Sequence, residues 1–407
     1  MTSISLSAKR ERWLLLTLAG VQFTHILDFM IMMPLGPQFR EIFSVSDAQF
    51  GLLVSAYTLA AGFSGLVAST CVDRFERKRL LLVLYSLFAL ATFACGLASS
   101  YELLMGARVA AGLFGGVLSA LLQTIVADVI PFERRGQAMA VVMTAFSVST
   151  VAGVPLGLVL ANALGWHATF VAIAVLSAVL AVGAAFTLPS LSGHLVSGRA
   201  HTAWSGVAQV LADPNHRRAF VFSMLLMGAG FMVIPYITLF MQANVQVPVS
   251  RIPLIYLCGG LATLVSARWF GRMTDQRGKV ETYTVLAVAV CVPLVGITLL
   301  PASPLPVVLV VTTALFAVMG GRVIPGMSII ASTAQPALRG TFLVLNSAVQ
   351  SMAMGAAAFA GGLLIGRSES GLVQGYWAAG VLGALFSLGS VWLARGLVLH
   401  GSGPQRI

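Results

Sequence analysis

The sequence is poor in charge, and above all in acidic residues. Only 9% of its 407 residues are charged, with 13 Asp and Glu against 24 Lys and Arg, whereas a soluble globular chain carries about 25% charged residues. Hydrophobic residues make up 58% of the chain. This composition excludes water as the main solvent of the fold and indicates a membrane protein.

Cysteine is rare as well. The four cysteines show no paired spacing, and each lies in or at the end of an apolar stretch, so neither a disulfide framework nor a zinc site is supported. We interpret them as small packing residues and expect no metal. They are Cys71, Cys95, Cys258 and Cys291.

Several motifs that carry chemistry are missing. The chain has no GxSxG and no HExxH, which argues against a membrane enzyme. It also has no GxxxxGK[ST] phosphate loop, which argues against a pump driven by ATP. We therefore expect no enzyme and no cofactor, and any transport would draw its energy from an ion gradient, such as a proton gradient.

Long apolar stretches are what the chain has in abundance. Twelve of them contain about 20 residues, enough for a helix to cross a hydrocarbon layer about 30 Å thick. They predict an all-α membrane protein with twelve transmembrane helices. We place the helices near residues 13–36, 48–70, 79–99, 102–127, 137–163, 166–188, 219–241, 251–273, 282–301, 305–332, 340–366 and 372–396.

The basic residues are unevenly distributed among the segments between these helices. If the N-terminus lies inside, 19 of the 24 Lys and Arg fall in cytoplasmic segments, and only Arg40, Arg251 and Arg367 in outer ones. This excess predicts a multi-pass protein of the cell (inner) membrane with both termini in the cytoplasm. We expect the lipid bilayer as its partner and no nucleic acid, because no basic patch with interleaved aromatics exists outside the loops.

Matched features recur in the two halves of the chain at a nearly constant offset of 202 to 205 residues. In each half an Asp precedes a basic loop, a Gly-Gly pair lies in a later helix, and an Arg-Gly pair follows that helix. The shared order indicates a duplication, as many transporters have. The matched positions are Asp73 and Asp275, Gly115–Gly116 and Gly320–Gly321, and Arg135–Gly136 and Arg339–Gly340.

A stretch rich in Ser, Gly, His and Arg interrupts the membrane pattern in the middle of the chain. It predicts a cytoplasmic linker at residues 189–218 between two pseudo-symmetric six-helix bundles, residues 1–188 and 219–407. Within the linker, residues 204–211 have helical spacing before the breaker at 213–215. This spacing fits either a short surface helix or an unstructured tether.

The first basic loop, Asp73-Arg74-x-x-Arg77-Lys78, resembles the signature of the major facilitator superfamily between helices 2 and 3. Asp275-x-Arg277-Gly278-Lys279 is similar to the second copy of that signature, and the resemblance covers essentially the whole chain. The family usually has Gly where this chain has Ser69 and Glu76, and the added carboxylate can pair with Arg77 or Arg79. The resemblance implies the major facilitator fold and a secondary transporter that works by alternating access; we expect it to act as a monomer.

The resemblance also implies that the two basic loops form a cytoplasmic gate. A carboxylate at a helix end is favoured beside the N-terminus of another helix, which carries about half a positive charge. Helix starts near Gly340 and Gly136 are the candidates to receive Asp73 and Asp275, respectively. The alternative is a purely topogenic role, in which the arginines only hold the loops in the cytosol.

Charged side chains deep in the helices are few. Asp28 lies 15 residues after Trp13, roughly 22 Å into the first helix from the cytoplasmic side. The fourth helix enters the membrane from the outer side, and Arg108 lies in it at a similar depth. We predict that they pair, since a buried charge is costly alone, and that the pair binds and releases the coupling proton. His25 shares a helix face with Asp28 and can relay the proton. The alternatives are a permanent structural ion pair and a packing histidine.

Two helices carry further patterns of the family. Arg108-x-x-x-Gly112 resembles the helix 4 signature of its proton-coupled members. Gly153-Val154-Pro155-Leu156-Gly157, which predicts a bent helix that approaches a neighbour closely, looks like the helix 5 signature of its antiporters. Export is therefore favoured. Because Val154 separates the Gly from the Pro, a proton-coupled importer stays the alternative, and a membrane receptor without transport is a third.

A pocket for a small-molecule substrate is expected near the membrane midplane between the bundles. The few deep charges fit neutral, amphipathic or anionic cargo better than a polycation, so we expect drug-like or sugar-like compounds. Each uncharged polar residue proposed for the pocket has packing as its alternative role, and Arg322 is either a substrate or gating group or a snorkelling structural arginine. The candidates are Gln22, Tyr57, Gln123, Asn162, Tyr236, Arg322, Asn346 and Gln350.

Overall fold

The fold is almost entirely α-helical. Within the described ranges, the strands form one short antiparallel pair, β1 (Gly366–Arg367) and β2 (Val373–Gln374). In the same ranges, twelve helical spans are long and apolar enough to cross a membrane. The predicted all-α class with twelve transmembrane helices is confirmed. The computed structural model describes residues 7–71, 74–131, 134–191, 203–335 and 338–400.

Contacts along the chain define two compact units. Unit 1 comprises Met1–Met32 and Ala56–Ala200, and unit 2 comprises Met33–Ser55 and His201–Ile407. The boundary falls inside one helix, α3 (Asp47–Cys71), whose first two turns belong to unit 2. The bundle boundaries that we drew from the sequence duplication stay a prediction.

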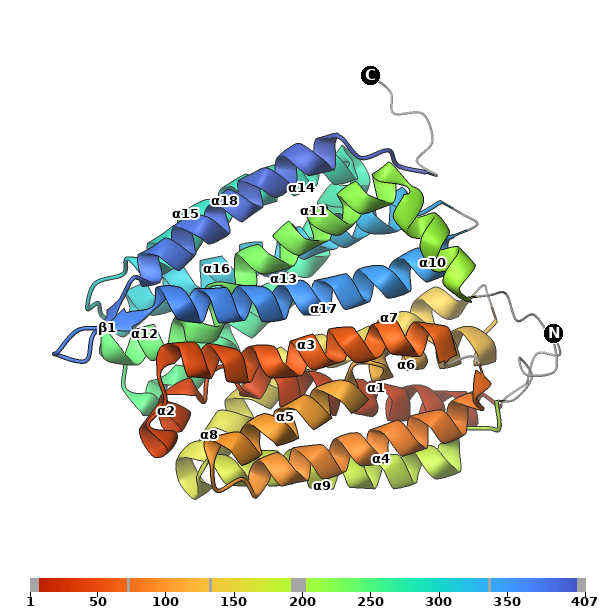
Figure 1. Cartoon of the computed structure of the whole chain (residues 1–407), viewed down its shortest axis with the longest axis horizontal. Helices are drawn as coiled ribbons and strands as arrows, with labels where there is room; N and C mark the ends of the chain where they lie inside the picture. Colours follow the sequence, from red (N-terminus) through yellow and green to blue (C-terminus); the bar gives the residue numbers. More distant parts are fainter. Residues whose placement is uncertain (1–6, 72–73, 132–133, 192–202, 336–337, 401–407) are drawn as a thin grey trace. The chain divides into compact units, whose positions relative to one another are not determined.

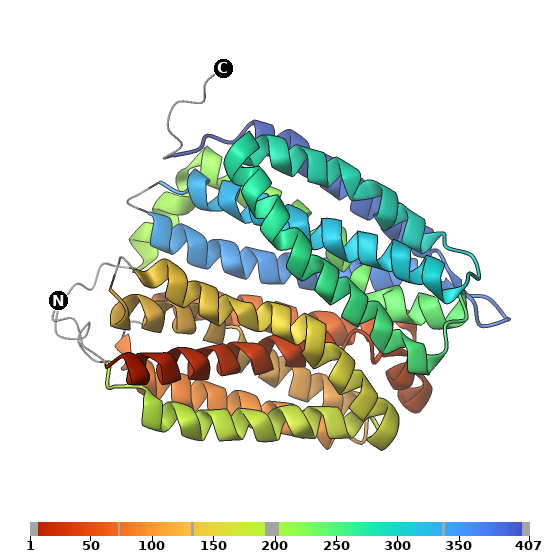
Figure 2. The same cartoon turned by 180° about the vertical axis from the view of Figure 1, so that it is seen from behind.

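Unit 1 contains the remainder of α3 and most helices of the first half of the chain. Its α4 and α9 run side by side in Figures 1 and 2. Two of its spans are built from two helices in series: α5 continues into α6, and α7 continues through a π-helical turn into α8. The elements are α1 (Ala8–Ile31), α4 (Arg77–Gly96), α5 (Tyr101–Gly115), α6 (Leu118–Val129), α7 (Arg135–Val148), the π turn (Ser149–Gly153), α8 (Val154–Leu164) and α9 (Trp166–Thr187).

Unit 2 contains the helices of the second half and the short α2. In it, α13 packs along α16 (Figure 2), and α11 packs against α17 and α18 (Figure 1). The elements are α2 (Gly36–Phe43), α10 (Ala203–Ala212), α11 (Pro214–Phe231), a 3-10 turn (Ile234–Tyr236), α12 (Ile237–Ala243), a 3-10 turn (Val249–Arg251), α13 (Ile252–Arg277), α14 (Lys279–Ala289), α15 (Cys291–Thr298), α16 (Leu305–Thr333), α17 (Arg339–Leu364) and α18 (Tyr376–Arg395).

The first helix lies five residues earlier than predicted. It begins at Ala8, after Ser7 caps it by accepting a hydrogen bond from the backbone N–H of Arg10, and it ends at Ile31. The predicted range of 13–36 was wrong at both ends because it followed apolarity alone. Charged residues extend the helix at its start, and Pro34 restricts the backbone of the residue before it, which favours a helix end there.

The second basic loop is shorter than predicted. α13 continues through Asp275 to Arg277, and α14 begins at Lys279, so Gly278 alone connects the two helices. Gly278 has φ of 94°, a conformation that glycine adopts without strain. Asp275 therefore lies in the last turn of α13, and the prediction of a loop around it was wrong.

The linker contains the short helix that the spacing allowed. α10 occupies Ala203–Ala212, and Asp213 then caps α11 by accepting a hydrogen bond from the N–H of Asn215 at 2.8 Å. Pro214 takes the first position of α11, where its missing N–H leaves no hydrogen bond unmade. The breaker at 213–215 thus ends one helix and begins the next.

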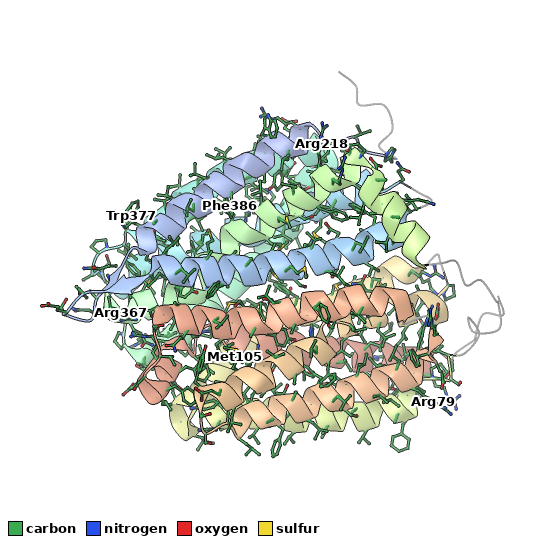
Figure 3. All side chains as sticks on the ribbon, in the orientation of Figure 1. Arg79, Met105, Arg218, Arg367, Trp377 and Phe386 are labelled. Carbon is green, nitrogen blue, oxygen red and sulfur yellow. The ribbon has the colours of Figure 1, made fainter. Side chains whose placement is uncertain are left out.

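Large apolar side chains lie both inside the units and on their surface. Leu18, Tyr85 and Phe88 are fully buried in the core of unit 1. On the outer faces, Phe186 is 85% exposed and Trp392 79%, and Figure 3 shows carbon-rich side chains such as Trp377 projecting from the helices. An apolar surface of this extent is unstable in water and suits lipid, as expected for a multi-pass membrane protein.

Candidate functional site

The centre of unit 1 holds a buried ion pair between α1 and α5. Arg108 Nη1 donates to Asp28 Oδ2 at 2.8 Å, and neither side chain has any solvent-exposed surface. The same nitrogen lies 3.4 Å from the carbonyl oxygen of Asp28. The structure thus brings together the two charges that the sequence placed at one depth.

The carboxylate has a second partner, which sequence reasoning missed. Thr92 on α4 donates its hydroxyl to Asp28 Oδ1 at 3.2 Å, and Thr92 is itself fully buried. Both carboxylate oxygens are therefore hydrogen-bonded, as a buried charge requires. No sequence signal distinguishes Thr92, because a threonine inside an apolar helix commonly bonds its own backbone.

An aromatic ring covers the guanidinium. Arg108 Cζ lies 4.4 Å from the centre of the Tyr57 ring, and Tyr57 is 3% exposed. The cation is thus held by the ring face as well as by Asp28. Glycine at position 112 makes this approach of α3 to α5 possible, since a Cβ there would overlap the carbonyl oxygen of Tyr57.

His25, one helical turn before Asp28 on α1, lies near the Tyr57 ring. Its ring centre is 6.2 Å from that of Tyr57 and 5.8 Å from that of Phe88. Within the described part of the chain, neither ring nitrogen of His25 has a hydrogen-bond partner, although both are buried. The structure therefore places His25 beside the ion pair but does not bond it to the pair.

The fifth span packs closely on α1. A Cβ at Gly153 would lie 2.9 Å from Leu27 Cδ1, and one at Gly157 would lie 2.8 Å from Ile31 Cδ1. Between α7 and α8 the helix opens into a π turn, which precedes Pro155. Such π turns are often found at functional sites, and this one holds α1 on both sides of Asp28.

A second buried arginine lies in unit 2. Arg322 is 1% exposed; it donates to the Ser387 hydroxyl at 2.9 Å and to the Leu226 carbonyl oxygen at 2.8 Å. Ser387 in turn donates to the carbonyl oxygen of Ala287. Arg322 thereby connects α11, α14, α16 and α18, and no carboxylate among the described residues pairs with it.

The other polar residues predicted for the pocket belong to both units, three to each. Several are engaged locally: Gln22 exchanges hydrogen bonds with Ser119 at 3.1 and 3.2 Å, and Asn346 accepts one from Ser223 at 2.6 Å. Tyr236 donates to the carbonyl oxygen of Ala358, Gln350 contacts the sulfur of Met327, and Gln123 and Asn162 are exposed. The role of all these residues in a substrate pocket stays a prediction.

The first basic loop is partly described. Asp73 lies outside the described residues, Arg74 is exposed and Lys78 is half-buried. Arg77, at the start of α4, forms an ion pair with Asp128 at the end of α6. Sequence reasoning did not consider Asp128, because it lies at the end of an apolar stretch and 51 residues away.

Glu76 pairs with Arg79 and not with Arg77. Its Oε2 lies 3.0 Å from Arg79 Nε, while its Oε1 accepts a hydrogen bond from the Ser190 hydroxyl at 2.7 Å. The Ser190 hydrogen bond, the N–H of Leu191 and the nearby cations hold the pKa of the Glu76 carboxyl below its ordinary value. The extra carboxylate therefore ties the start of α4 to the segment after α9.

The second basic loop is exposed. Asp275, Arg277 and Gly278 are all exposed, whereas Lys279 donates to the Ser332 hydroxyl at 2.6 Å. This bond joins the start of α14 to the end of α16. The roles of both loops as a gate stay predictions.

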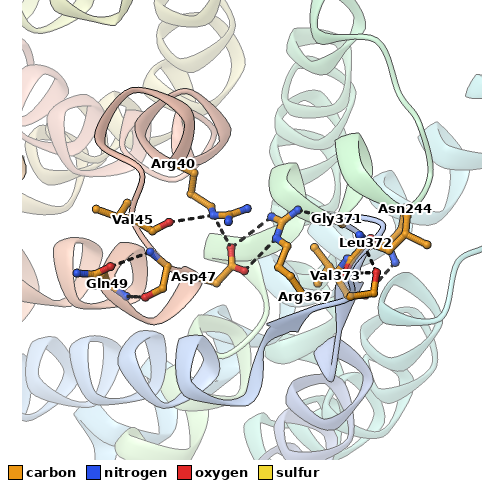
Figure 4. Close-up of polar contacts among 11 residues, drawn as sticks. Arg40, Val45, Asp47, Gln49, Asn244, Arg367, Gly371, Leu372 and Val373 are labelled. Atoms are coloured by element: carbon orange, nitrogen blue, oxygen red, sulfur yellow. Dashed lines mark hydrogen bonds and ion pairs between the residues drawn. The ribbon is translucent and has the colours of Figure 1, made fainter.

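A further charged cluster, missed from the sequence, lies in unit 2 (Figure 4). Asp47 is 3% exposed and accepts hydrogen bonds from Arg367 Nε at 3.1 Å and Nη2 at 3.3 Å. Arg40 Nε lies 3.3 Å from the same carboxylate. Burial, together with the charge of Arg367, lowers the pKa of Arg40, and Asp47 opposes that shift.

The comparison with known families gives a match over three quarters of the chain. The model of the Major Facilitator Superfamily matches residues 18–321. An uncharacterized MFS-type transporter of Bacillus subtilis (strain 168), YtbD, is 24% identical over 381 residues, which cover 92% of this chain and 94% of the relative. A probable sugar efflux transporter of Mannheimia succiniciproducens is 24% identical over 233 residues, 57% of each chain.

Solved structures with the same arrangement of helices include two transporters. The crystal structure of a D-xylose-proton symporter aligns with a TM-score of 0.76 at 16% identity, and covers 94% of this chain and 97% of that one. A bacterial homologue of the human lysosomal transporter Spinster, in an inward-facing and occupied conformation, aligns with a TM-score of 0.72 at 15% identity, and covers 97% and 98%. At these identities the likeness concerns the fold.

Proposed function

Because the chain belongs to the major facilitator superfamily, we propose that it is a proton-coupled antiporter that exports small amphipathic compounds, drug-like or sugar-like. The family and the relatives are transporters, so the chain is a transporter and not an enzyme. We place it in the cell membrane with both termini in the cytoplasm, acting as a monomer and driven by a proton gradient without a cofactor.

The buried pair of Asp28 and Arg108 is the observation that carries the coupling. A carboxylate paired with a guanidinium stays ionised, whereas a carboxylate that loses this partner in a dry environment takes up a proton. The bonds from Arg108 and Thr92 stabilise the ionised state. A proton on Asp28 replaces the attraction to Arg108 and lets α1 and α5 separate, so protonation and helix movement depend on each other.

Export is supported by the fifth span and by relatives. The π turn and the close approach of Gly153 and Gly157 to α1 place the antiporter-like segment against the helix that carries Asp28. Two relatives, from Mannheimia succiniciproducens and Helicobacter pylori, are named probable sugar efflux transporters. We propose that the loops at Asp73 and Asp275 act as the cytoplasmic gate of this cycle.

Inverted membrane vesicles test the proposal. We expect drug-like or sugar-like compounds, added one at a time to vesicles with an acidic interior, to be taken up together with proton release, which a pH-sensitive dye records. Asp28→Asn should abolish this uptake while the protein still inserts at the wild-type level. Full proton-driven uptake by the variant would refute the coupling role, and proton movement in the direction of the cargo would indicate an importer.

A further inference from the structure

The unpartnered polar atoms beside the ion pair meet at one point of α5. Tyr57 Oη and both ring nitrogens of His25 are buried without a hydrogen-bond partner in the described part of the chain. A Cβ on Gly115 would lie 2.7 Å from Tyr57 Oη and 3.2 Å from His25 Nε2. Two polar tips from α1 and α3 thus converge on a glycine, and buried polar groups without partners are rare and costly.

The charges around this point select an uncharged ligand. Asp28 already balances Arg108, so the guanidinium would repel a second cation, and an anion would compete with the carboxylate. A neutral imidazole has one ring nitrogen as hydrogen-bond donor and the other as acceptor. A phenol hydroxyl also donates and accepts. A hydroxyl, which also donates and accepts, can satisfy both side chains.

Aromatic rings surround the same point. Phe29 stacks on Tyr57 with ring centres 5.5 Å apart, and His25 lies against Phe88. Such rings suit the apolar C–H face of a ring or chain that carries hydroxyls. The side chains of His25 and Phe29 are half-buried, although the two ring nitrogens of His25 are themselves buried.

We propose that His25 and Tyr57, beside Arg108 and Gly115, form a site for a hydroxyl group of an uncharged molecule. The site adjoins the proposed proton-coupling pair, so the inference deepens the proposed function and rests on it for its role. The hydroxyl belongs either to the cargo, which would then be an uncharged polyol or sugar-like compound, or to a water that exchanges protons with Asp28. The two sources predict different effects of Tyr57→Phe and His25→Phe: a cargo hydroxyl predicts weaker binding, and a water predicts slower proton uptake.

Equilibrium binding to the purified full-length protein tests the chemistry of the ligand. The probes share one ring and differ in charge: methyl β-D-glucoside is neutral, methyl β-D-glucosaminide is a cation and methyl β-D-glucuronide is an anion at pH 7. We expect the neutral probe to bind most tightly, and Tyr57→Phe and His25→Phe to weaken it about tenfold, the loss of roughly one hydrogen bond. Tighter binding of the charged probes would overturn the proposal.

Tyr85→Phe is the matched control. The Tyr85 hydroxyl is buried in the same unit but bonds Thr24 Oγ1 at 2.7 Å. Its removal should lower the melting temperature and leave probe binding unchanged. Tyr57→Phe should show the opposite pattern, with weaker binding and an unchanged or higher melting temperature, because its hydroxyl bonds no other described residue.

The rate of proton uptake after a pH jump, measured on the purified protein with an indicator dye, separates the two sources. Weaker glucoside binding in Tyr57→Phe and His25→Phe assigns the hydroxyl to the cargo. Unchanged or unmeasurable glucoside binding together with proton uptake slowed several-fold assigns it to water. If both variants bound the glucoside as the wild type does and took up protons at the wild-type rate, the proposed site would be overturned. Failure of export in vesicles would refute the proposed function and leave these measurements on purified protein intact.

Discussion

At the residue scale, the ion pair of Asp28 and Arg108 is the most consequential contact of the first unit. The two groups are fully buried and bonded at 2.8 Å, so each is the other's only full charge compensation among the described residues. A buried pair adds little net stability over apolar residues of the same shape, yet the loss of one member is costly because the other is left unpaired. Stability and function should therefore respond differently to single and double substitutions.

Arg108→Gln should destabilise the protein by about 3–5 kcal/mol, because it leaves Asp28 without its counter-ion. Adding Asp28→Asn should recover most of that loss, since the uncompensated charge is then gone. Proton-driven export should be absent from both variants. Thermal unfolding of the detergent-solubilised protein gives the stabilities; an additive double variant, with no recovery, would show that the two charges do not depend on each other.

At the element scale, glycines set how closely the helices of unit 1 approach. Gly112 on α5 and Gly116, directly after α5, face backbone carbonyl oxygens of α3, whereas a Cβ at Gly106 on α5 would meet no atom of another element within 4 Å. Small residues at such contacts let membrane helices pack backbone to backbone. The position of the Tyr57 ring over Arg108 depends on this approach.

Gly112→Ala should lower stability by about 1–3 kcal/mol, as overpacking of a tight contact does, and should also impair export by displacing Tyr57 from Arg108. Gly106→Ala is the control on the same helix. It should be neutral or stabilising by up to about 1 kcal/mol, because alanine favours the helix more than glycine does. Melting temperatures of the two variants compared in one detergent provide the measurement; equal values would contradict the packing argument.

The helices also show where prediction from the sequence succeeds and fails. Their number follows from apolar length, which the bilayer imposes on any spanning segment. Their ends do not, because caps and turns extend them past the apolar stretch, as at Ala8 and Arg277. The interruption of the fifth span follows from Gly153 and Pro155, which predicted a bend, whereas its form as a π turn between α7 and α8 was not predicted.

At the scale of the whole molecule, ion pairs between residues far apart in the chain differ in whether the sequence predicts them. The pairing of Asp28 with Arg108 was predictable, since deep charges are so few that the partner is nearly determined. The binding of Asp47 by Arg367 was not. An Asp at a helix start has an ordinary local explanation, and its partner follows 320 residues later. Distance along the sequence hides contacts that no local rule requires.

The cluster of Asp47, Arg40 and Arg367 connects elements from opposite ends of the chain within unit 2. Arg40 belongs to α2, Asp47 begins α3, and Arg367 belongs to β1, where its Nη1 also donates to the carbonyl oxygen of Gly371 at 2.8 Å. Asn244 holds the same hairpin through two hydrogen bonds with Val373, both 2.9 Å long. One carboxylate thus balances two guanidinium groups and fixes three elements.

Asp47→Asn should therefore destabilise the protein by about 2–3 kcal/mol, because the two arginines then repel each other without a shared anion. The loss should be smaller than for Arg108→Gln, since Arg40 and Arg367 are 27% and 21% exposed and water screens them in part. Asp275→Asn, which removes an exposed carboxylate at the end of α13, is the control and should leave thermal unfolding unchanged. If adding Arg40→Gln to Asp47→Asn restored no stability, repulsion between the arginines would not be the cause, and the bidentate bond with Arg367 would account for the whole loss.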